Sequence, residues 1–81
     1  MKDTDYFLTL MLKTMRKKSR GYEEYGSRVM PVLQVFKGLK TVEEKRAFVA
    51  AMETMLADND PAVRRYAVSV CVGFVLLRDV V

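Results

Sequence analysis

The stretch DPAVRRYAVSVCVGFVLL, residues 60–77, decides the fold of this chain. Asp60 is a preferred residue at a helix N-cap, and Pro61 suits the first helical position, where its missing amide hydrogen has no partner to lose. The competing interpretation is a strand, because valine is abundant here and favours sheets. The cap signal, the length of the run and the lack of a companion strand elsewhere in the sequence favour a helix.

This predicted helix is apolar on two sides, and a helix of that kind is normally buried on both. Its primary face has Val63, Tyr66, Ala67, Val70, Phe74 and Leu77. A second strip on the other side, called here the valine strip, consists of Val68, Val72, Val75 and Leu76. We therefore expect a second copy of the chain, or another helical protein, to cover the valine strip, and we predict a homodimer.

Three more segments have helical periodicity. The first spans Thr4–Lys18 and the second Ser27–Lys37, whereas residues 21–26 between them fit either a loop or an extra helical turn. The third begins at Thr41, which forms a predicted capping box with Glu44. The inward stripe expected for this third helix is Phe48, Val49, Met52, Met55 and Leu56. The sequence thus predicts an all-α protein of four helices.

The join between the third and fourth helices, MLADNDPAVRRYA at residues 55–67, resembles the turn inside a HEAT repeat. In that family an aspartate precedes a short turn, and a valine–arginine pair and an alanine follow it. The matching positions here are Asp58, Val63, Arg64 and Ala67. The resemblance, which covers residues 41–77, implies that the aspartate and the arginine hydrogen-bond the turn and link neighbouring repeats in a ladder.

The resemblance also implies an architecture for the single domain at residues 1–81. Four helices would form two antiparallel hairpins with HEAT-like right-handed stacking, with residues 41–80 as the HEAT-like hairpin. Residues 1–38 would be a diverged hairpin, or helices that merely pack on the repeat. Solenoid units bury their faces only against neighbours and usually need three or more repeats for stability, which again predicts a protein partner.

The residue inventory limits the chemistry of the chain. Without histidine there is no Ser-His-Asp triad and no His-containing zinc site. Asp58 and Asp60 could be metal ligands or acid–base groups, but their spacing fits helix capping and turn stabilisation, with Arg64 as the third structural residue of the turn. Cys71 lies within the valine run, where we expect an unreactive core thiol. We expect no enzymatic activity, no cofactor and no metal.

A set of basic residues, called here the basic stripe, is the other candidate binding surface. Its members follow helical spacing i, i+3, i+4 and i+7 and are Lys13, Arg16, Lys17 and Arg20. The net charge of +4 permits an anionic partner. The stripe is either a solvated helix face or a sequence-independent phosphate-binding surface whose affinity falls with salt.

These observations lead to two functional expectations. The first is a small helical interaction or scaffold module that self-associates through its C-terminal helix. The alternative is a nucleic-acid-binding accessory protein that uses the basic stripe. The longest apolar stretch, residues 66–77, is too short to span a bilayer, so we expect no membrane insertion. The lone cysteine and the lack of an export signal favour a cytoplasmic protein.

Overall fold

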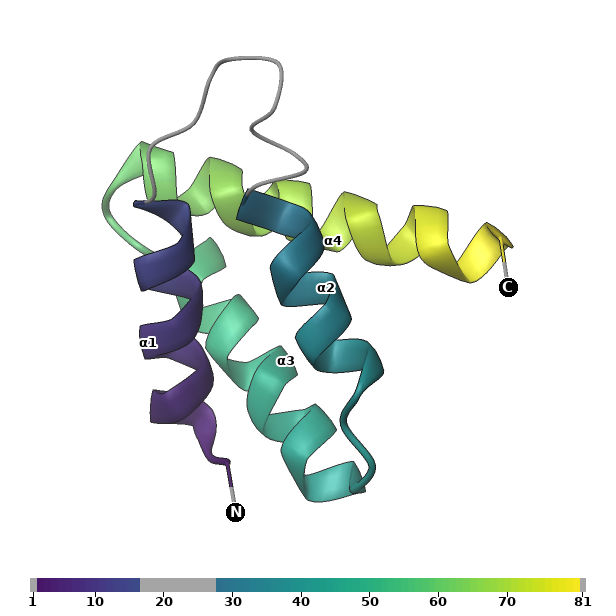
Figure 1. Ribbon diagram of the computed structural model, residues 1–81. Coiled ribbons are helices and arrows are strands. Elements are labelled where there is room, and N and C mark those ends of the chain that lie inside the picture. Colours follow the sequence, from purple (N-terminus) through teal and green to yellow (C-terminus); the bar gives the residue numbers. More distant parts are fainter. Residues whose placement is uncertain (1, 17–27, 81) are drawn as a thin grey trace.

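The described part of the chain, residues 2–16 and 28–80 of a computed structural model, consists of helices and short connections between them. The helices are α1 (Thr4–Met15), α2 (Met30–Lys37), α3 (Val42–Leu56) and α4 (Pro61–Val80), and no strand occurs among these residues (Figure 1). The side chains of α4 are described as far as residue 76. The prediction of an all-α protein is therefore confirmed, and the strand interpretation of residues 60–77 is wrong.

The first helix begins where the sequence predicted. Asp3 is its N-cap, because the Tyr6 amide donates to the Asp3 carboxylate at 2.9 Å. Within the described residues α1 ends at Met15, with Arg16 as the C-cap. The remainder of the predicted first helix, Lys17 and Lys18, lies outside the described residues. Residues 21–26, for which the sequence fits either a loop or an extra helical turn, lie outside them as well.

The predicted start of the second helix, Ser27, lies outside the described residues. A wider helical turn at Arg28 and Val29 precedes α2, and the regular α-helix begins at Met30. Pro31 stands in its first turn, where a missing amide hydrogen costs no internal hydrogen bond. Gly38 ends the helix, with its amide 3.1 Å from the Gln34 carbonyl. The proline is thus compatible with a helix at this position.

Half of the predicted capping box is present at the start of α3: Thr41 caps the helix, and the Glu44 carboxylate reaches back to the Thr41 hydroxyl instead of the Thr41 amide. The Glu44 amide donates to the Thr41 hydroxyl at 3.1 Å, and that hydroxyl is 3.2 Å from the Glu44 carboxylate. A second carboxylate oxygen of Glu44 is 3.5 Å from the Lys2 amide. The Glu44 side chain therefore joins the start of α3 to the segment before α1.

The core is organised around Phe48, which is fully buried on α3. Its ring contacts one aromatic ring from each other helix, with centroid distances of 5.4 Å to Phe7, 5.1 Å to Phe36 and 5.7 Å to Phe74. The pairs with Phe7 and Phe74 are edge-to-face and the pair with Phe36 is tilted, and aromatic pairs stabilise a core beyond the burial of their area. Phe48 therefore links all four helices in one cluster.

The packing of α1 differs from a simple hairpin with α2. The most extensive contacts are those of α1 with α3 and of α3 with α4, whereas α2 packs chiefly on α4. The reason is that the buried residues of α1, Phe7 and Met11, belong to the cluster around Phe48. Among the described residues α1 therefore packs on α3, and both arrangements expected for residues 1–38 stay predictions.

The last helix, α4, lies across the rest of the fold. It crosses the other three helices near one end, and its C-terminal half extends beyond their edge (Figure 1). One side of α4 is held in the core by Tyr66, Ala67 and Val70. The opposite side of the helix is consequently turned away from the protein's own core.

Candidate protein-interaction surface

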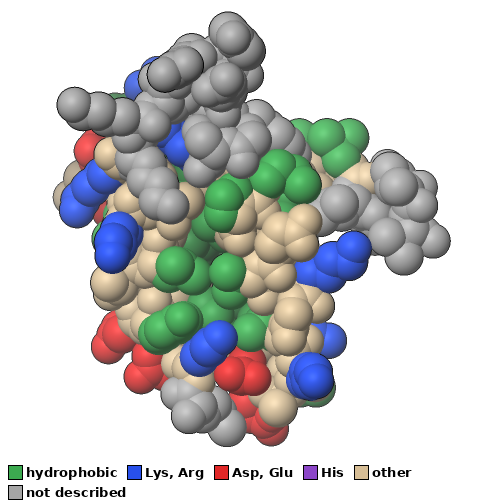
Figure 2. Space-filling model, viewed as in Figure 1, with side chains coloured by type: hydrophobic (Ala, Val, Ile, Leu, Met, Phe, Trp, Pro, Cys, Tyr) green, Lys and Arg blue, Asp and Glu red, His purple; other side chains and the backbone are tan. Residues whose placement is uncertain are grey.

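The valine strip lies on the outer side of α4. Val68, Val72, Val75 and Leu76 are each about half exposed, between 49% and 54%. On the inner side of the same helix, Ala67 and Val70 are almost completely buried. The second apolar side of α4 is therefore uncovered by the described part of the chain, and Figure 2 shows hydrophobic side chains at the surface over α4.

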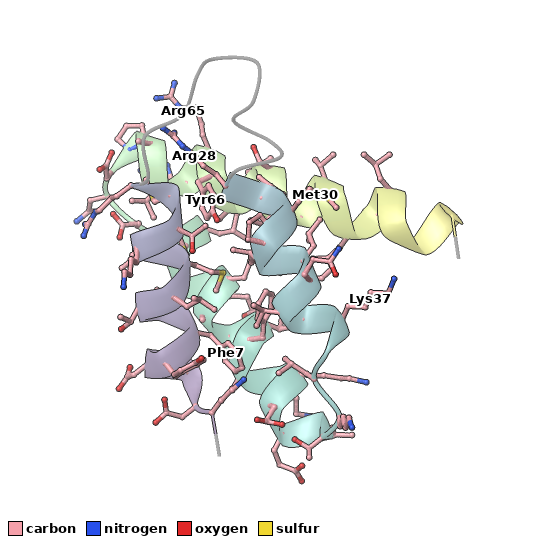
Figure 3. All side chains as sticks on the ribbon, in the orientation of Figure 1. Phe7, Arg28, Met30, Lys37, Arg65 and Tyr66 are labelled. Carbon is pink, nitrogen blue, oxygen red and sulfur yellow. The ribbon has the colours of Figure 1, made fainter. Side chains whose placement is uncertain are left out.

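The orientation of α4 is fixed by contacts from its inner side. The Tyr66 hydroxyl donates to the Arg28 carbonyl oxygen at 2.5 Å, and Figure 3 shows these two residues. The rings of Phe74 and Phe36 have a centroid distance of 4.7 Å. Burial raises the pKa of Tyr66 to about 12, and the charge of Arg28 opposes this shift only in part. The neutral phenol stays a hydrogen-bond donor at neutral pH, so α4 cannot rotate to bury the valine strip without breaking this contact.

The turn between α3 and α4 contains the three residues singled out by the sequence. The Asp58 carboxylate accepts the Asp60 amide at 2.8 Å, and the Asp60 carboxylate accepts the Ala62 amide at 2.9 Å. The Arg64 guanidinium donates to the Asp58 carbonyl at 2.7 Å. All three side chains thus stabilise the turn, and a ladder between neighbouring repeats stays a prediction.

The structure also places the residues considered for chemical reactivity, which are the Cys71 thiol and the side chains that could bind a metal ion. The Cys71 thiol is 3.5 Å from the Met52 sulfur and only partly buried, and its burial raises its pKa, which favours the unreactive thiol form. Within residues 2–16 and 28–80, no three Cys, Asp or Glu side chains are grouped so that they could hold a metal ion.

The basic stripe is only partly within the described residues. Lys13 and Arg16 are exposed at the C-terminal end of α1, whereas Lys17 and Arg20 lie outside the described part. Cations at this end of a helix also interact favourably with its dipole. The nucleic-acid alternative therefore stays a prediction.

An apolar surface on α3 was missed by the sequence analysis. Its members, called here the α3 strip, are Val42, Val49 and Leu56, which are 57%, 37% and 37% exposed. Val49 and Leu56 were expected to point inward, so that part of the prediction is wrong. The helix buries a narrower stripe than expected, centred on Phe48, Met52 and Met55. The seven-residue spacing of the α3 strip is the signal that was available.

Comparisons with known proteins give no relative: no protein-family model, curated protein or solved structure matches the chain. In the part of the chain that the structure describes, none of the helices combines the length and apolar character needed to cross a membrane. The surfaces described above are therefore the basis for a functional proposal.

Proposed function

We propose that this chain is a small protein-interaction module that associates with a second copy of itself through the valine strip of α4. The observation that carries the proposal is the contrast between the two sides of one helix, apolar on both but buried on one only. Exposed contiguous apolar patches of this kind mark interaction surfaces in soluble proteins. The α3–α4 pair would be the HEAT-like hairpin, with right-handed stacking of the two halves, and the Asp58–Arg64 turn supports this part of the proposal.

The expected affinity follows from the exposed area. Complete burial of a valine or leucine side chain contributes about 1.5–3 kcal/mol, so covering a half-exposed one contributes roughly 1 kcal/mol. Four such side chains on each of two copies give roughly 8 kcal/mol before the cost of association. With an association cost of about 4 kcal/mol, we therefore expect a weak dimer with a dissociation constant of roughly 1 mM.

The test is a sedimentation-equilibrium comparison of the parent chain with Val72→Asp. The substitution places a charge in the centre of the strip, and we expect at least a tenfold weaker association because the interface would have to bury that charge. Ala62→Asp, an exposed position on the same helix away from the strip, is the matched control and should associate like the parent. A parent chain that stays monomeric at millimolar concentration would refute the proposal.

A further inference from the structure

The α3 strip has charged neighbours in an ordered arrangement. Val42, Val49 and Leu56 run along the outer side of α3, and a shallow hollow beside them is lined by Arg46, Ala50 and Glu53 together with Lys45. Both Arg46 and Glu53 are exposed. Neither side chain makes a hydrogen bond or ion pair with another residue of the described part of the chain.

Helix geometry places the two charges on the same flank of the strip. A step of seven residues covers almost two helical turns and drifts by only about 20°, so the three apolar residues stay nearly aligned. Arg46 is four residues after Val42, and Glu53 is four residues after Val49. Each charge is therefore offset from the strip by about 40° in the same direction.

We propose that the α3 strip is a second self-association surface, at which α3 pairs antiparallel with α3 of another copy. A two-fold axis beside Val49 would bring Val42 of one copy opposite Leu56 of the other. The same axis would bring Arg46 to within one residue, about 1.5 Å along the helix, of the level of Glu53 of the second copy, and it does so twice, once at each end. The patch is thus complementary to itself, which is the requirement for a two-fold dimer interface.

The order of the charges identifies both the occupant and its direction. A parallel two-fold arrangement would place this flank of the two copies on opposite sides of the interface, so Arg46 and Glu53 of one copy would not face those of the other. Only the antiparallel arrangement gives two oppositely charged pairs. A second copy presents this complementary order automatically, so the pattern is explained without a different partner.

The α3 strip and the valine strip lie on different helices, so the two proposals are independent. A protein with two different two-fold surfaces forms assemblies larger than a dimer if both are used. The test is therefore made in chains that have the Val72→Asp substitution, in which association through α4 is removed. If that background still associates, the contact lies elsewhere, and α3 is the predicted place.

The decisive experiment is a charge swap measured by sedimentation equilibrium at low salt. Arg46→Glu gives a chain with two acidic residues at these positions, and Glu53→Arg gives a chain with two basic ones. We expect each single variant to self-associate roughly tenfold more weakly, because both pairs become repulsive. The double variant should recover the parent affinity, and an equimolar mixture of the two single variants should form a mixed dimer.

Three outcomes would overturn the proposal. They are a Val72→Asp chain that is monomeric at millimolar concentration, single variants that associate like the parent, and a mixture that does not form the mixed dimer. All these positions are exposed, and circular dichroism checks that each variant keeps its helices. If Val72→Asp does not weaken association through α4, the charge swap can still be interpreted, because Arg46→Glu and Glu53→Arg alter only the α3 contact.

Disulfide trapping tests the position of the axis. In a Cys71→Ser background, Val49→Cys should form a disulfide-linked dimer on mild oxidation, because residue 49 of one copy meets residue 49 of the other. Val42→Cys is the matched control and should cross-link poorly, since it faces residue 56. Equal cross-linking of the two variants would overturn the antiparallel register.

Discussion

Replacing Phe48 by leucine tests whether one ring joins the four helices. Phe48 is fully buried and contacts Phe7, Phe36 and Phe74, each from a different helix. Each aromatic pair contributes about 0.5–1.5 kcal/mol beyond its buried area. Leucine keeps most of the apolar volume but none of the ring contacts, so we expect a loss of about 2 kcal/mol.

That loss is large for a chain of this size. Stability of roughly 0.05–0.15 kcal/mol per residue gives an 81-residue protein only about 4–12 kcal/mol. The complete truncation, Phe48→Ala, would cost about 3–5 kcal/mol and bring the protein close to unfolding at room temperature. The leucine variant is therefore the one in which the change can be measured.

The assay is urea unfolding followed by far-ultraviolet circular dichroism, which measures the helical content of the chain. With a slope of about 1–3 kcal/mol per molar urea, the midpoint should fall by roughly 1–2 M. Tyr6→Leu is the control, because Tyr6 is exposed and its ring contacts Phe7 alone among the described aromatic rings. A Phe48→Leu chain as stable as Tyr6→Leu would show that the ring cluster does not hold the helices together.

Two further predictions concern local contacts. Thr41→Ala should destabilise the protein by about 1 kcal/mol in thermal or urea unfolding, because the first turn of α3 loses its cap, whereas Thr54→Ala, at an exposed mid-helix hydroxyl, should not. Burial raises the pKa of Tyr66 to about 12 from 10.0, so the folded state favours the protonated phenol. Stability from this group is complete below pH 10 and falls as the pH rises from 10 to 12. Comparing unfolding of the parent and Tyr66→Phe over this range isolates the effect, and an equal fall in both proteins would contradict it.

The sequence predicted the helices well, because their signals are local. The Thr41 capping box, Asp60 before Pro61 and the apolar spacing of residues 63–74 each lie within a few neighbouring residues. The packing partner of α1 and the width of the buried stripe on α3 depend on residues far apart in the chain. Periodicity therefore placed Val49 and Leu56 in the core, whereas the cluster around Phe48 leaves their side of α3 open.

The candidate surfaces were predictable to different degrees. The valine strip followed from the sequence, because two apolar sides on one helix are visible in the spacing of Val68, Val72 and Val75. The α3 strip did not, because two of its three members, Val49 and Leu56, were counted with the core. Only the burial of each side chain in the structure distinguishes a core residue of α3 from an exposed residue of the α3 strip.

The hydrogen bond from Tyr66 to the Arg28 carbonyl has a consequence for local opening of the fold. The eight-residue α2 has no side-chain N-cap and is too short to be a stable helix on its own. Its amides can be protected from hydrogen exchange only while α4 is in place, so the two helices should open as one cooperative unit. A ligand that tightened α4 would thereby slow exchange in α2 without touching it.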